Sequence, residues 1–254
     1  MLIKEFKADA LQVKVYDTRQ SLGEAAAAEA AEYLRELLDE KEEVCAVFAA
    51  APSQNEFLAS LAASPGIDWG RVHALHMDEY VGLSEDAPQS FGNFLRRAIF
   101  DLVPFGKVDY IGPVDDPEAA MARYDRILSE NPVDVVFMGI GENGHIAFND
   151  PHVADFHDPL RIKRVDLDQV CRMQQVHDGC FPTLEEVPEY ALTLTVPALA
   201  EAGRLFCMVP ASTKADAVKA TVLGPVSERV PATVMRLHPA ATLYVDADSG
   251  KYIL

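Results

Sequence analysis

The chain has 254 residues, of which 49% are apolar and 24% are charged, an ordinary composition for a globular protein with one large core. Its 40 acidic and 22 basic residues give a net charge of −18, and a surface of that sign repels nucleic acid and anionic membranes. No apolar run has the length of a membrane span, and the N-terminal residues lack the apolar stretch of a signal peptide. We therefore expect a cytoplasmic protein that has neither nucleic acid nor a membrane as a partner.

Apolar runs alternate with amphipathic segments along the chain. The runs expected as strands are 11–16, 44–51, 72–77, 108–111, 133–140, 162–167, 191–196, 204–209, 233–237 and 242–245. The segments expected as helices are 21–41, 56–63, 91–102, 117–129 and 213–221. This order predicts an α/β fold, a doubly wound, mostly parallel Rossmann-like sheet with helices on both faces, in a single domain over residues 1–254.

Nothing in the sequence calls for a metal or an organic cofactor. Cys45 and Cys207 lie in apolar runs and read as buried thiols, and there is no CxxC pair. The histidines and aspartates between 145 and 158 are dense, but no spacing among them matches a zinc signature. Residues 139–144 match the GxGxxG pattern of nucleotide sites, yet no helix is expected straight after them.

Two adjacent carboxylates, Asp78 and Glu79, follow the apolar run 71–75. In open α/β sheets ligands bind beyond the carboxyl ends of strands, so this is a position for a functional side chain. A partly desolvated carboxylate has a raised pKa and is a better base. We expect Asp78 to continue the strand directly and to serve as that base, while a solvated strand end is an equal alternative for Glu79.

A histidine in a glycine-rich turn follows the apolar run 133–140. The glycines of residues 139–144, among them Gly144, allow close approach of the backbone to a ligand. Asn143 and Asp150 flank His145, and Asp150 could accept a ring N–H and fix the tautomer. Together with Asp78, this turn predicts a site at which protons are moved.

Two strand-to-helix junctions are candidates for binding an anion. Ser53 and Gln54 begin a helix after an apolar run, and helix N-terminal amides suit phosphate, although an ordinary polar loop fits the spacing as well. Lys214 stands at the other junction and could supply a cation. The polar segment 171–181 either lines a site or covers one.

At these residues the chain resembles the glucosamine-6-phosphate deaminase/isomerase family, over nearly its whole length. The blocks that carry the resemblance are His76-Met77-Asp78-Glu79-Tyr80-Val81-Gly82-Leu83, Gly141-Glu142-Asn143-Gly144-His145-Ile146-Ala147-Phe148-Asn149, Ser212-Thr213-Lys214-Ala215 and Leu237-His238-Pro239. The resemblance implies a cofactor-free aldose–ketose conversion of an amino sugar phosphate, with release of ammonia. A sugar phosphate would be the partner, and an assembly of identical chains stays open.

The resemblance also implies roles for single residues. Asp78 would move the proton between C1 and C2, and His145 would open the sugar ring, with Asn143 and Asp150 as its partners. Lys214 would bind the phosphate. Ser53, Gln54, Glu79 and Gly144 would contribute to substrate binding.

Three positions depart from the family pattern. The phosphate loop, usually rich in Thr and Gly, reads Ala50-Ala51-Pro52-Ser53-Gln54-Asn55. The partner acid of the histidine, often Glu, is Asp150. The arginine that binds phosphate in typical members is missing near Asp178, and Arg172 could substitute for it. These departures mark a branch with an altered phosphate loop and bear on the substrate more than on the reaction.

Two other functions compete with the deaminase reading. The sister family, 6-phosphogluconolactonase, continues its histidine block with Thr-Ala-Ser-Leu, where this chain has Ile146-Ala147-Phe148-Asn149. A non-catalytic sugar-phosphate sensor would have no use for a base paired with a histidine. Both comparisons favour the deaminase/isomerase activity.

Overall fold

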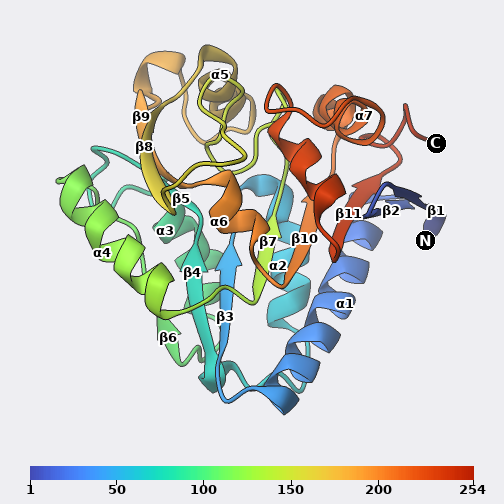
Figure 1. The fold of residues 1–254 in the computed structure, drawn as a ribbon, viewed down its shortest axis with the longest axis horizontal. Coiled ribbons are helices and arrows are strands. Elements are labelled where there is room, and N and C mark those ends of the chain that lie inside the picture. Colours follow the sequence, from blue (N-terminus) through green and yellow to red (C-terminus); the bar gives the residue numbers. More distant parts are fainter.

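An eight-stranded sheet forms the middle layer of the computed structural model, which describes residues 1–254 (Figure 1). Its strands lie in the order β1 (Leu2–Ala8), β2 (Leu11–Tyr16), β11 (Ala241–Asp246), β10 (Arg204–Val209), β7 (Val135–Met138), β3 (Val44–Phe48), β4 (Val72–His76) and β6 (Lys107–Val108). All neighbours pair in parallel except β1, which pairs antiparallel with β2 at the edge. The predicted doubly wound α/β fold is confirmed.

Helices cover both faces of this sheet. They are α1 (Arg19–Glu40), α2 (Asn55–Ala62), α3 (Phe91–Leu95), α4 (Pro117–Glu130), α5 (Gln169–His177), α6 (Val196–Ala200) and α7 (Ala215–Leu223). Each face carries a core of 36 buried residues, one packed with α1, α2 and α3 and the other with α4, α6 and α7. Side chains of the central strands alternate between the two cores, since Val47 enters one while Ala46 and Phe48 enter the other. None of the helices is both long and apolar enough to cross a membrane.

A second, smaller sheet stands above the carboxyl edge of the first. It joins β5 (Asp78–Tyr80), β9 (Tyr190–Leu194) and β8 (Ile162–Asp166), all antiparallel. The expectation that Asp78 continues the strand before it is therefore wrong, because β4 ends at His76 and the chain enters the second sheet at Asp78. In Figure 1 the arrows of β3 and β7 point toward the end of the molecule where β8, β9 and α5 lie.

Three further segments differ from the expected elements. Residues Pro231–Leu237, expected as a strand from 233, form the 3₁₀ helix η6. The hydroxyl of Thr233 donates to the carbonyl of Val230 and accepts the N–H of Ser227, so local bonds replace a ladder. Strand β1 and helix α5 were not anticipated, since exposed polar residues obscure both patterns.

Candidate active site

A single cleft at the carboxyl edge of the main sheet is lined by half of the ten residues that the sequence singled out. Asp78 comes from β5, His145 from the loop after β7, and Lys214 from the turn after β10. Ser53 and Gln54, which follow β3, also line it. Residues far apart in sequence meet here because parallel strands end at one edge of the sheet.

Asp78 is a buried carboxylate on a fixed backbone. Its pKa is raised well above the ordinary value by burial and by the neighbouring charge of Glu79. Burial lowers the pKa of His76 to about 4, so that ring is neutral. The N–H of Ile111 donates to its Nε2 at 2.9 Å, which leaves Nδ1 to donate to the carbonyl of Asp78 at 2.9 Å. The site therefore holds a carboxylate that accepts a proton more readily than an exposed one.

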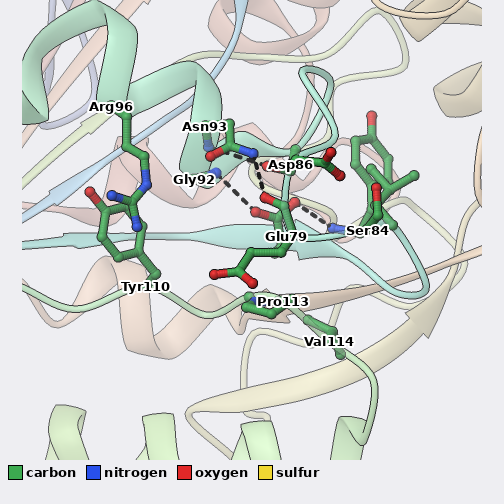
Figure 2. A pocket seen from close by; sticks show the side chains of 14 residues that line it. Glu79, Ser84, Asp86, Gly92, Asn93, Arg96, Tyr110, Pro113 and Val114 are labelled. Atoms are coloured by element: carbon green, nitrogen blue, oxygen red, sulfur yellow. Dashed lines mark hydrogen bonds between the residues drawn. The ribbon is translucent and has the colours of Figure 1, made fainter.

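Glu79 points to the opposite face of β5, because side chains alternate along a strand. Its carboxylate accepts the backbone N–H groups of Tyr80 at 3.0 Å, Phe91 at 3.0 Å and Gly92 at 2.9 Å. It lines a separate hollow of about 630 Å³, whose lining residues are drawn in Figure 2 and include none of those that line the cleft. Glu79 is thus placed outside the cleft, which corrects the expectation that it binds substrate there.

His145, Asn143 and Asp150 form a relay at the cleft. The Nδ1 atom of His145 lies 2.7 Å from Oδ1 of Asn143 and 3.0 Å from Oδ1 of Asp150. The Nδ2 group of Asn143 donates to Asp150 at 2.9 Å. Burial raises the pKa of Asp150, but bonds from His145 and Asn143 outweigh it and leave that pKa lowered. Both acceptors call for a proton on Nδ1, so Nε2 is the nitrogen that can exchange a proton with a ligand.

The glycines of this loop have distinct tasks. A Cβ on Gly141 would collide with the imidazole of His145, so the ring lies directly against the backbone. Gly144 adopts φ of +86°, a conformation that side chains rarely adopt, and its Cβ would meet Val230 at 2.8 Å. Gly144 therefore shapes the turn and does not face the cleft, contrary to its expected part in binding.

Lys214 is the one cationic side chain that lines the cleft. It is 5% exposed and has no ion-pair partner, and burial lowers its pKa although Asp178 and Glu142 oppose this. Ser53 and Gln54 line the same cleft, but the backbone N–H of Gln54 already donates to the carbonyl of Ala51 at 2.9 Å. An anion would be bound by Lys214 and neutral groups, and the backbone N–H of Gln54 would not contribute.

The turn that presents Lys214 is held from below by the end of β11. Ala211 adopts φ of +84°, which is strained for a residue with a side chain. Its N–H donates to both oxygens of Asp246, at 3.1 and 3.3 Å. Ser249 also donates its N–H to Asp246 at 2.8 Å and its hydroxyl to Val209 at 2.6 Å. These buried bonds maintain the strained turn.

Helix α5 contributes the side-chain amides of two glutamines to the cleft and no second cation. Arg172 donates to the carbonyls of Leu184 at 2.9 Å and Val187 at 2.8 Å, and it does not line the cleft. The expectation that Arg172 substitutes for the missing phosphate arginine is therefore wrong. Gln174 and Gln175, both buried, line the cleft instead.

Two groupings of potential metal ligands occur near the relay, His145 with Asp150 and Cys171, and Asp150 with His152 and Asp168. Burial and nearby carboxylates raise the pKa of the Cys171 thiol well above its ordinary value, so it is protonated and a poor ligand. Because Asp150 is also occupied by Asn143 and His145, we assign no metal to either grouping.

A protein family and several characterised proteins are similar to this chain in sequence. The family model described as glucosamine-6-phosphate isomerases/6-phosphogluconolactonase matches residues 17–244. The chain belongs to this family. It is 37% identical over 175 residues to a glucosamine-6-phosphate deaminase of Lactobacillus helveticus, covering 68% of this chain and 71% of that protein. It is 33% identical over 200 residues to one of Streptococcus pyogenes, with 78% and 82% covered.

Solved structures of the family share the fold. A monomeric glucosamine-6-phosphate deaminase superposes with a TM-score of 0.85 at 26% identity, covering 94% of this chain and 98% of that one. The 6-phosphogluconolactonase of Thermotoga maritima superposes with a TM-score of 0.75 at 19% identity, covering 93% and 99%. At that identity the second likeness shows the fold alone.

Several residues of this family member's site were not found from the sequence. Gln174 and Gln175 line the cleft and lie in the polar segment 171–181, whose sequence fits lining a site and covering one equally well. No motif marks Asp168 or Asp246, although Asp168 accepts a hydrogen bond from Asn143 and Asp246 accepts one from the turn that presents Lys214. An aspartate before a helix is a capping signal, but α5 itself was not anticipated.

Proposed function

We propose that this chain converts an amino sugar phosphate from aldose to ketose and releases ammonia, with glucosamine-6-phosphate giving fructose-6-phosphate. The observation that carries the proposal is the meeting of Asp78, whose pKa is raised, with the His145 relay in one cleft. The deaminase relatives support it. The four free thiols, three of them buried, fit a cytoplasmic location, and the proposal leaves open an assembly of identical chains.

The chemistry needs two proton-transfer groups. The unprotonated Nε2 of His145 takes the proton from the C1 hydroxyl and delivers it to the ring oxygen as the bond between C1 and that oxygen breaks, which opens the pyranose and exposes the C1 aldehyde. Asp78 then removes the proton from C2 and returns it to C1, while the amino nitrogen loses a proton and O1 gains one, which converts the 2-amino aldehyde into a 1-hydroxy-2-imine. Water adds to that imine, and ammonia departs from C2. An Asp78 without hydrogen-bond donors is suited to accept and return a proton, since nothing holds it in the charged form.

The far end of the substrate would meet Lys214. A buried ammonium without an ion-pair partner is stabilised by an incoming anion, which favours a phosphate there. Ser53, Gln174 and Gln175 add neutral donors around it. Because this chain is strongly acidic and offers a single cation, phosphate binding depends on Lys214.

An ammonia assay with glucosamine-6-phosphate tests the proposal, with 6-phosphogluconolactone run in parallel. We expect ammonia and a ketose phosphate in equal amounts from the first compound and no hydrolysis of the second. Lactone hydrolysis without ammonia would assign the chain to the lactonase side of the family. Turnover of neither compound would refute both activities.

A further inference from the structure

Asp168 joins the relay of His145 to helix α5. It precedes α5, and its Oδ1 accepts the N–H of Cys171 at 2.6 Å, which caps the helix. Its Oδ2 accepts Nδ2 of Asn143 at 3.1 Å, and its own N–H donates to Oδ2 of Asp150 at 3.4 Å. One residue thus serves both the helix start and two members of the relay, since its carboxylate bonds Asn143 and its backbone N–H bonds Asp150.

These contacts fix which way the amide of Asn143 points. Its two N–H groups are taken by Asp150 at 2.9 Å and Asp168 at 3.1 Å. The amide oxygen must then face His145, where it accepts the backbone N–H at 3.0 Å and lies 2.7 Å from Nδ1. The orientation of the amide in turn selects the tautomer of the ring.

A second contact ties α5 to the same loop. Gln174 accepts the N–H of Glu142 at 2.8 Å with its side-chain oxygen, one residue before Asn143. Gln174 and Gln175 also line the cleft. The helix that lines the cleft is therefore bonded to the loop of His145 at two points, through Asp168 and Gln174.

We propose that Asp168 is a positioning residue, which sets the orientation of Asn143 and thereby the tautomer of His145. The proposal rests on the proposed role of His145 in proton transfer. The relay then depends on the position of α5. The glutamines of α5 that line the cleft and the residues that transfer protons are therefore positioned together.

The test is Asp168→Asn in the full-length chain. Asparagine can still cap α5, but its N–H₂ group then faces the N–H₂ of Asn143, two donors that cannot bond. Asp116→Asn is the matched control, because Asp116 caps α4 by accepting the N–H of Ala119 at 3.1 Å and has no contact with the site. Asp168→Ser keeps a capping oxygen and removes only the acceptor that reaches Asn143.

Three measurements separate positioning from folding. We expect Asp168→Asn and Asp168→Ser to lower kcat on the order of 10²-fold, as misplaced catalytic groups do, with KM changed less than about threefold. Asp116→Asn should leave kcat within about twofold. Because all three variants keep a side chain that can cap the helix, their melting temperatures should not track the differences in kcat. The Nδ1–H proton signal of His145, identified by its loss in His145→Gln, should weaken or shift only in the Asp168 variants.

Equal kcat losses in Asp168→Asn and Asp116→Asn, or an Nδ1–H signal of His145 that does not respond to Asp168, would overturn the proposal. The spectrum needs no substrate. If the wild type releases no ammonia but its Nδ1–H signal still depends on Asp168, the proposed reaction fails while the positioning role stands.

Discussion

The two faces of β5 give neighbouring carboxylates different hydrogen-bonding surroundings. Both Asp78 and Glu79 are buried, and burial raises the pKa of each. Glu79 accepts three backbone N–H groups, which favour its charged form, whereas Asp78 has no such donors and its pKa lies well above the ordinary value. Charges that the fold satisfies hold the structure together, and charges that it leaves without partners remain available to a ligand.

The same contrast separates the two cations first assigned to phosphate. Arg172 donates to two carbonyls of the chain and lies away from the cleft, while Lys214 has no ion-pair partner and lines it. Whether a charged side chain already has a bonding partner within the chain therefore separates binding residues from structural ones better than its charge or its position near the cleft.

The largest effect is expected at Asp78. Asp78→Asn keeps the shape but cannot accept a proton, and loss of a general base lowers the rate on the order of 10²–10⁴-fold. Ammonia release under saturating glucosamine-6-phosphate measures it. Glu79→Gln is the adjacent control and should keep activity within about tenfold. Comparable losses in the two variants would erase the distinction between the faces.

The next effect concerns the phosphate end. Lys214→Ala removes one charge-assisted contact, worth about 1.5–3 kcal/mol or roughly 10–150-fold in binding. We expect KM to rise by that factor for glucosamine-6-phosphate and to change little for glucosamine. Arg172→Ala should leave KM nearly unaltered. A wild type that prefers unphosphorylated glucosamine would show that the altered loop no longer selects phosphate.

A third effect is on stability at the back face of β5. Glu79→Gln places an N–H₂ group opposite backbone N–H groups, and a buried unsatisfied donor costs about 1–3 kcal/mol. Urea unfolding should show the free energy of unfolding falling by this amount. An unchanged unfolding midpoint would mean that these three bonds contribute no net stability.

The smallest effect is the dependence of stability on pH. In the folded chain the pKa of Asp78 is raised, so the native state binds its proton more tightly than the unfolded state does. Stability is therefore lost as pH rises from the unfolded value of about 3.9 through the raised folded value. Asp78→Asn should melt above the wild type at pH 8, and the gap should close as pH falls toward 4. A gap independent of pH would mean that Asp78 does not titrate in this range.

The sequence by itself determined most of the order of strands and helices, with β1, α5 and η6 as exceptions, because apolar periodicity records which face of each element is buried. It also marked Asp78, His145, Asn143, Asp150 and Lys214 as candidates. Strand periodicity carried one more signal, since Asp78 and Glu79 must point to opposite faces.

Only the tertiary structure decided which polar groups find partners. Arg172 depends on carbonyls of Leu184 and Val187, and Asp168 depends on Asn143 lying beside the start of α5. The second sheet arises because β5 pairs with β9, a strand more than a hundred residues away in the chain. Hydrogen bonds between distant segments leave no local pattern in the sequence, so only the tertiary structure reveals them.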